Sequence, residues 1–136
     1  MDNKFYVSYE AARLLKEKGY DRECIAYYQN GEFHPYSVDL FKLSINDKNA
    51  APSYMNQYSA PTKAEAIDWL ESKGMVVEFY IYNILYDNCT IKRCWGYRIL
   101  QGDELLFTDN SSNTPTRLEV EEAAIIKTCK LLENGN

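Results

Sequence analysis

Apolar residues recur at the spacing of an amphipathic helix in three separate stretches of the chain. This pattern predicts helices at about Tyr9–Lys18, Lys63–Lys73 and Arg117–Leu132. The second and third helices each begin with a Thr-x-x-Glu capping box, at Thr62–Glu65 and at Thr116–Glu119. In that motif the threonine hydroxyl accepts from the N3 amide while the glutamate accepts from the N-cap amide. Two otherwise unpaired donors are satisfied, so the starts of both helices are well defined.

Three segments of strand composition lie between the second and third helices. They cover about Val76–Tyr86, Ile91–Leu100 and Glu104–Thr108, with turn residues at Asp87–Thr90 and at Gly102-Asp103. Because short turns join antiparallel neighbours, these strands are expected to form a three-stranded antiparallel meander. The predicted fold class is α+β, with two helices flanking the meander in an α-β-β-β-α unit.

The N-terminal part has the pattern of a helix followed by a β-hairpin. Ser8 is placed to cap the first helix, and Gly19 is placed to end it. Asn30-Gly31 favours a type I′ turn, because both positions adopt positive φ readily. The turn would join strands at Cys24–Gln29 and Glu32–His34. We expect this helix and hairpin to pack on or beside the α-β-β-β-α unit.

A chain of 136 residues is long enough for one domain and short for two. Within a single domain, 1–136, we expect a helix–hairpin subregion at 1–44 and the α-β-β-β-α unit at 62–136. Between them, residues 45–61 are rich in Asn, Ser, Pro and Ala and are expected to form one long loop. Loops of that length are uncommon and often functional.

Aromatic side chains gather on one side of the predicted meander. If the first turn has four residues, Tyr86 pairs with Ile91, and side-chain alternation determines which residues share a side. The candidate interaction face then consists of Tyr80, Tyr82, Arg93, Trp95 and Tyr97.

The opposite side of the predicted sheet is aliphatic and is expected to lie under the second and third helices. Two interpretations of the aromatic side stay open: the N-terminal helix and hairpin cover it, or it is exposed and binds a partner or a second copy. A one-residue shift in register would exchange the two sides. The aliphatic side collects Val77, Phe79, Ile81, Leu85, Cys94, Gly96, Leu100, Leu105 and Phe107.

Charge and hydropathy narrow the classes of function. The net charge is −5, whereas proteins held on nucleic acid by phosphate neutralisation usually carry a basic stripe. The cations are scattered apart from Lys92, Arg93 and Arg98, so nucleic-acid binding is disfavoured. No apolar run reaches the roughly 18 residues of a membrane span, and no secretory signal is visible. We therefore expect no membrane association and a cytoplasmic location.

The sequence offers no recognisable catalytic or metal-binding constellation. His34 is the one histidine, and the four cysteines lack the C-x-x-C spacing of zinc and redox sites. Phosphate-binding, dinucleotide-binding and nucleophile-elbow motifs do not occur. We therefore predict no cofactor, no metal and no enzymatic activity.

Three stretches together carry a resemblance to known proteins: Ser8–Tyr20 with Cys24, Tyr58–Thr62 with Trp69-Leu70, and Leu118–Ala124. In these stretches the chain resembles a group of small proteins from phages and prophages of Bacteroides-type gut bacteria. No reaction is established for that group, so the resemblance transfers no catalytic residue. It implies a shared fold and a phage- or prophage-type accessory role.

The function that fits these observations best is non-enzymatic protein–protein association. The chain would form either a homodimer or a complex with an unidentified protein partner. One alternative is a nucleic-acid-associated module that uses Lys92, Arg93 and Arg98 beside the Tyr and Trp rings. A second alternative is a small enzyme whose cleft lies under the 45–61 loop.

Overall fold

The computed structural model describes residues 4–22, 24–35, 57–85, 88–109 and 116–132. These residues form three helices and two three-stranded antiparallel sheets, which confirms the predicted α+β class. The helices are α1 (Tyr9–Glu17), α2 (Lys63–Ser72) and α3 (Arg117–Leu131). The strands are β1 (Tyr27–Gln29), β2 (Glu32–His34), β3 (Gln57–Ser59), β4 (Met75–Leu85), β5 (Ile91–Gln101) and β6 (Glu104–Asp109).

The smaller sheet has the strand order β2-β1-β3. Its hairpin is the predicted one, since Asn30 and Gly31 have φ angles of 53° and 83°, as a type I′ turn requires. The third strand, β3, pairs with β1 through Tyr28 and Tyr58. The prediction of one loop over 45–61 is therefore wrong at Gln57–Ser59, and residues 45–56 lie outside the described part of the chain.

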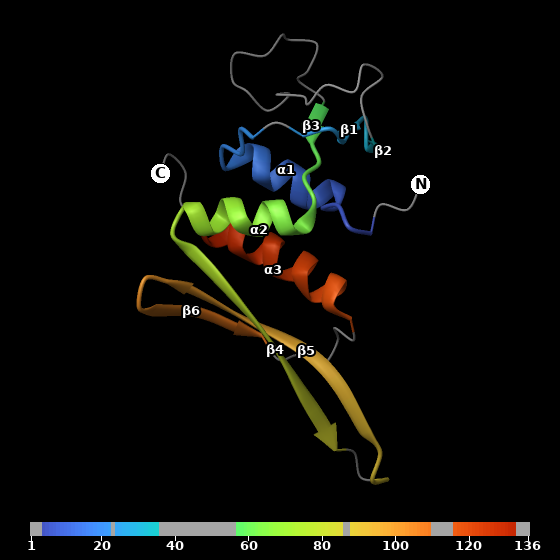
Figure 1. The fold of residues 1–136 in the computed structure, drawn as a ribbon, viewed down its shortest axis with the longest axis vertical. Helices are drawn as coiled ribbons and strands as arrows, with labels where there is room; N and C mark the ends of the chain where they lie inside the picture. The colour runs from blue at the N-terminus through green and yellow to red at the C-terminus, as the bar shows by residue number, and fades with distance from the viewer. Residues whose placement is uncertain (1–3, 23, 36–56, 86–87, 110–115, 133–136) are drawn as a thin grey trace.

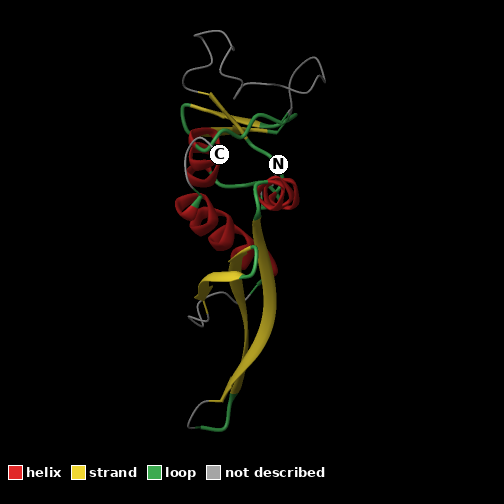
Figure 2. Cartoon of the chain, turned by 90° about the vertical axis from the view of Figure 1, so that its left-hand side faces the viewer, coloured by secondary structure: helices red, strands yellow, loops and turns green. Residues whose placement is uncertain are grey.

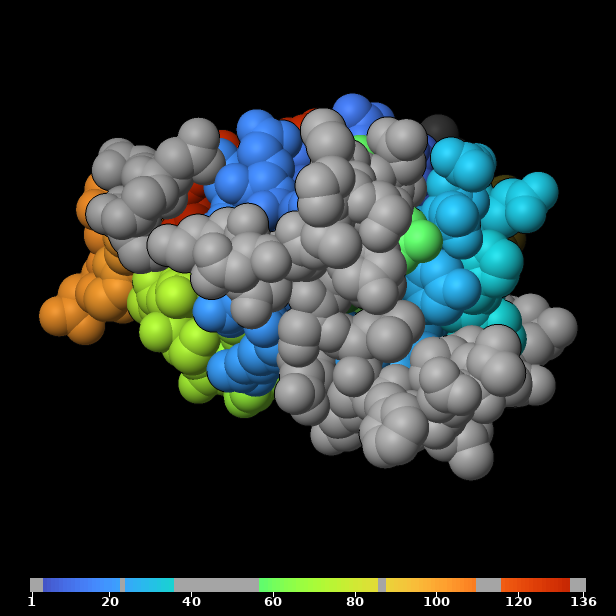
Figure 3. All heavy atoms as spheres, turned by 90° about the horizontal axis from the view of Figure 1, so that it is seen from above, coloured from blue at the N-terminus to red at the C-terminus, as the bar shows by residue number. Residues whose placement is uncertain are grey.

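The three helices lie between the two sheets, with the smaller sheet on one side and β4, β5 and β6 on the other (Figure 1). Helix α1 packs on α3 and β3, whereas α2 and α3 pack on the larger sheet. Seen from the end opposite that sheet, part of the N-terminal region (blue and cyan) lies at the surface (Figure 3). The interpretation in which the N-terminal helix and hairpin cover the aromatic side of the meander is therefore wrong for the described residues.

The predicted cap residues begin all three helices. At α2 the capping box is complete: the Thr62 hydroxyl accepts from the Glu65 amide at 3.1 Å, and Glu65 Oε1 accepts from the Thr62 amide at 2.9 Å. At α3 the Thr116 hydroxyl accepts from the amide of Glu119 at 3.2 Å. Both helix starts therefore follow from signals within four consecutive residues.

Helix α1 is capped by two segments far apart in the sequence. The Ser8 hydroxyl accepts from the amide of Ala11, which occupies the N3 position. Alanine cannot return the second hydrogen bond of a capping box, so the Ser8 amide donates instead to Oε1 of Glu122 in α3, at 2.6 Å. A carboxylate 114 residues away thus completes the cap and ties α1 to α3.

The register of β4 with β5 differs from the predicted one by a single residue. Leu85 pairs with Ile91, which leaves five residues between the strands rather than the predicted four. As a result Tyr80 lies opposite Gly96 and Tyr82 opposite Cys94, whereas the prediction placed Tyr97 and Trp95 there. Every cross-strand pair predicted for this hairpin is therefore wrong.

The second turn of the meander has the predicted two residues, because Gln101 pairs with Glu104. A bulge follows, so that Leu105 pairs with Leu100 and Phe107 with Ile99. Ile99 and Leu100 point to opposite sides of the sheet. The prediction that Leu105 and Phe107 share a side is therefore wrong.

A continuous cluster of buried side chains runs from the smaller sheet through the helices to the larger sheet. Trp69 and Tyr20 meet edge to face within it at 5.2 Å between ring centroids. The Tyr28 hydroxyl, buried in the same cluster, donates to the carbonyl of Val7 at 2.8 Å. This core fixes the helices on one side of the larger sheet and so determines which part of that sheet they leave uncovered.

Candidate functional site: a projecting hairpin arm

Strands β4 and β5 extend well beyond the helix layer (Figures 1 and 2). Strand β6 accompanies β5 only from Tyr97 to Gln101, so the hairpin beyond that point has two strands. We call this two-stranded part, Tyr80–Leu85 with Ile91–Gly96, the arm. Isolated two-stranded ribbons are marginally stable in water, so an arm of this kind benefits from further contacts.

The side of the arm that continues the helix-covered surface carries several exposed apolar side chains. Phe79 and Trp95 mark that surface, because the guanidinium of Arg117 at the start of α3 lies 4.6 Å and 5.2 Å from their ring centroids. Alternation along each strand places Asn83 and Arg93 on this side, together with three further apolar side chains. They are Ile81, Leu85 and Ile91, which are 50%, 70% and 66% exposed.

The opposite side of the sheet, which we call the far side, carries Tyr80 and Tyr82. The Tyr80 ring lies flat across β5, and its hydroxyl donates to the carbonyl of Asp109 at 3.0 Å. A Cβ at Gly96 would be 2.6 Å from that ring, so glycine is what allows the tyrosine to lie there. Arg98 stacks on the ring at 5.2 Å and pairs with Glu78 at 3.1 Å. Tyr80 therefore joins all three strands.

The five residues of the predicted interaction face lie on two sides of the sheet. Tyr80 and Tyr82 point away from the helices, as expected, whereas Arg93, Trp95 and Tyr97 share the helix side. The prediction of a common face is wrong, because one extra residue in the connection exchanges the sides of β5. Whether any of the five contacts a partner stays a prediction.

Tyr97 belongs to the core rather than to a surface. It is 4% exposed, and its ring lies 5.6 Å from that of Phe107. Burial, with a smaller contribution from Asp109, raises the pKa of Tyr97 to about 12. Its hydroxyl stays protonated at neutral pH.

The sequence places Ile81 and Leu85 on the correct side but misses their exposure. Strands of eleven residues span about 36 Å, whereas the fifteen residues of α3 span about 22 Å along their own axis. This difference in length could have indicated that the strands extend beyond the helices that cover them. The pattern of apolar residues alone does not distinguish a covered strand from a projecting one.

The basic residues do not form one patch. Arg93 lies on the helix side of the arm, while Lys92 and Arg98 lie on the far side. Arg98 is also engaged by Glu78 and by the Tyr80 ring. The predicted basic group is therefore divided between the two sides of the sheet, with Lys92 and Arg98 beside Tyr80 and Tyr82 and with Arg93 beside Trp95. Nucleic-acid binding stays an untested alternative.

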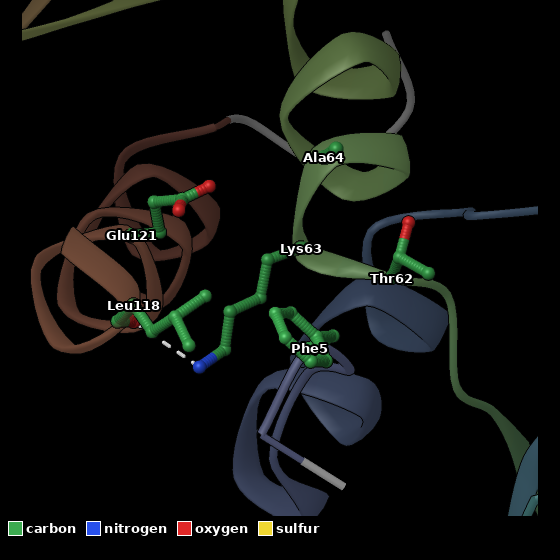
Figure 4. A pocket seen from close by; sticks show the side chains of 6 residues that line it. All are labelled: Phe5, Thr62, Lys63, Ala64, Leu118 and Glu121. Atoms are coloured by element: carbon green, nitrogen blue, oxygen red, sulfur yellow. Dashed lines mark hydrogen bonds between the residues drawn. The ribbon is translucent and has the colours of Figure 1, made fainter.

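A hollow of about 450 Å³ lies where the first turns of α2 and α3 meet (Figure 4). The Lys63 ammonium donates to the carbonyl of Leu118 at 3.1 Å, and Glu121 pairs with Arg117 at 3.5 Å. Thr62, which also lines the hollow, is part of the capping box of α2. Of these polar groups, the Lys63 ammonium joins α2 to α3, while Thr62 and Glu121 make contacts within their own helices. The lining residues are Phe5, Thr62, Lys63, Ala64, Leu118 and Glu121.

Within the described ranges, no cluster of three or more His, Cys, Asp or Glu side chains could hold a metal ion. His34 stacks on the ring of Tyr27 at 4.8 Å in the N-terminal hairpin. Cys24, Cys94 and Cys129 are buried, and Cys89 in the connection at the tip of the arm is exposed. Burial raises the pKa of Cys129 to about 12, so it is a thiol at neutral pH.

Comparison with family models, with curated proteins and with solved structures gave no match for this chain. None of the described helices combines the length and the apolar character that crossing a membrane requires.

Proposed function

We propose that this chain acts by protein–protein association and that the arm is its contact element. The observation that carries the proposal is the cross-strand pair of Leu85 and Ile91, with Ile81 farther along the same side of the arm, each at least half exposed. Exposed apolar groups that lie together are typical of binding surfaces, whereas isolated ones are not. A strand that projects from a rigid body can also add to a sheet of its partner through main-chain hydrogen bonds.

The proposal includes a non-enzymatic, phage- or prophage-type accessory role in the cytoplasm. Its supports are the resemblance of the α1, α2 and α3 sequences to such proteins and the structural use of the polar groups in the hollow between Lys63 and Glu121. In that role the arm brings the chain into an assembly, and the helices with the smaller sheet serve as its base.

Site-specific photo-crosslinking in cells that produce the chain tests the proposal. A photoreactive amino acid replaces Leu85 on the arm in one variant and Leu105 on β6 in the control. Both leucines are well exposed, at 70% and 54%, but Leu105 lies outside the arm. We expect covalent protein adducts from position 85 and far fewer from position 105. Equal or absent adduct formation at the two positions would contradict the proposal.

A further inference from the structure

Strand β4 forms one edge of the larger sheet, so one row of its amides and carbonyls has no neighbouring strand in the described structure. Natural edge strands are usually protected by lysines, prolines, bulges or shortness. This one has eleven residues, no Lys and no Pro, and its pairing with β5 is regular throughout. Glu78 is its single charged residue. An edge of this kind is suited to pairing with another strand.

We propose that the strand that pairs with this edge is β4 of a second copy, antiparallel and centred on Tyr80. The inference rests on the proposed function and names the partner. The result is a continuous six-stranded sheet, since each copy contributes β4, β5 and β6. The two-fold axis passes through the sheet at Tyr80 and leaves both helix layers on the same side.

Symmetry restricts the register of such a pair. In an antiparallel strand alternate residues direct their hydrogen-bonding groups outward, and only outward residues of both copies can bond to each other. Odd-numbered residues therefore lie opposite odd-numbered ones, which keeps the helix side of one copy beside the helix side of the other. Among the registers that remain, the one centred on Tyr80 pairs all eleven residues, Met75 with Leu85 at each end.

In this register the exposed apolar residues of β4 all lie beside apolar residues. Ile81, 50% exposed, lies opposite Phe79 of the second copy. Leu85, 70% exposed, lies opposite Met75 of the second copy, and Val76, 37% exposed, lies opposite Ile84. The edge is therefore complementary to itself in hydrophobicity.

The single charge on the strand selects the same register. Glu78 lies opposite Tyr82 of the second copy, where its carboxylate stays at the far side beside Arg98. A slide of two residues in either direction leaves two residues of each strand unpaired. Centring the pair on Glu78 itself would set two carboxylates directly opposite each other, which is unfavourable.

The pairing also accounts for the length of the arm. Helix α2 ends just before β4 and packs on its first residues, of which Met75 is buried. The antiparallel arrangement brings Leu85 of the second copy next to Met75, at the end of the sheet that the helices cover. Each arm thus reaches the helix layer of the other copy, which supplies the cover that its own helices do not.

Sedimentation analysis of the purified chain from low to high micromolar concentration tests the dimer. We expect a reversible monomer–dimer equilibrium for the wild type. Ile81→Lys places a charge opposite Phe79 of each partner and is expected to raise the dissociation constant at least about 100-fold. Leu105→Lys is the matched control, because Leu105 is 54% exposed but lies on the other edge strand, and it should leave the constant unchanged.

A spin label on Cys89 tests the register. Cys89 is the exposed one of the four cysteines, in the connection at the tip of the arm. Edge pairing centred on Tyr80 separates the two Leu85 residues by ten positions, or roughly 33 Å, so the labels should lie farther apart than that. Labels in close contact would indicate a tip-to-tip dimer and overturn the inference.

The remaining outcomes separate this inference from the proposed function. A strictly monomeric wild type, or dissociation by Leu105→Lys and not by Ile81→Lys, overturns the edge-paired dimer. Circular dichroism of the variants confirms that each is folded. If the purified chain is monomeric while position 85 still crosslinks to a different protein, the arm remains a contact element and only the identity of its partner is wrong.

Discussion

Replacing Gly96 by alanine should destabilise the sheet at the base of the arm. A Cβ at that position would lie 2.6 Å from two atoms of the Tyr80 ring and 2.7 Å from the carbonyl oxygen of Asp109. Neither contact is sterically tolerable. The ring must therefore lift, which breaks its hydrogen bond to Asp109, and the end of β6 must move away from β5.

Two contributions set the magnitude of this effect. Overpacking of a close-packed site typically costs about 1–3 kcal/mol, and a lost hydrogen bond about 0.5–1.5 kcal/mol. We expect Gly96→Ala to lower the free energy of unfolding by about 1.5–4.5 kcal/mol. That is a large share of the roughly 5–15 kcal/mol by which a typical domain is stable.

Urea denaturation followed by circular dichroism measures the loss, and Tyr80→Ala provides the control background. Without the ring, Gly96→Ala should cost less, because only the contact with the Asp109 carbonyl remains. A loss below about 0.5 kcal/mol, the level typical of neutral surface substitutions, would refute the argument. An equal cost in both backgrounds would show that the ring does not rest on Gly96.

Three further predictions follow from individual side chains. Glu122→Ala removes the acceptor of the Ser8 amide and should lower the free energy of unfolding by about 1–3 kcal/mol, measured in urea; a change within error would mean that the cap of α1 does not need it. Because the pKa of Tyr97 is raised from 10.0 to about 12, the folded state holds its proton longer than the unfolded state does, so stability should fall between pH 10 and pH 12. Urea midpoints over that range should fall less steeply for Tyr97→Phe than for the wild type, and identical slopes would be inconsistent with the raised pKa. One thiol, that of Cys89, should react rapidly with a thiol reagent in the folded protein, and Cys89→Ser should abolish this phase; a second rapid phase would show that a cysteine found buried is accessible.

The features that the sequence predicts correctly are encoded in short stretches. Thr62 and Glu65 cap α2 within one turn of helix, and Asn30-Gly31 determines its own turn type. The turn at Gly102-Asp103 is equally local. These signals were sufficient for the α+β class and for the order of elements in the meander.

Features that depend on contacts between distant segments could not be predicted from local sequence patterns. Strand β3 has the composition of a loop and becomes a strand only because Tyr58 pairs with Tyr28. The cap that Glu122 provides for Ser8 joins residues 114 positions apart. Nothing in either local sequence indicates these contacts.

The candidate site was predicted in part. The orientation of Tyr80 and Tyr82 away from the helices is correct, because it depends only on alternation along β4. The positions of Trp95 and Tyr97 depend on the length of the connection to β5, and one additional residue moved them to the other side. The exposure of Ile81, Leu85 and Ile91 depends on how far the helices extend over the sheet, which is a property of the assembled fold.

Hydrogen exchange of the β4 amides, followed residue by residue, tests the central claim most directly. Edge pairing predicts that the outward amides between Met75 and Leu85 are protected at high protein concentration, and that dilution or Ile81→Lys removes this protection. If every second amide of β4 exchanges freely at all concentrations, the edge has no partner strand and the claim is contradicted.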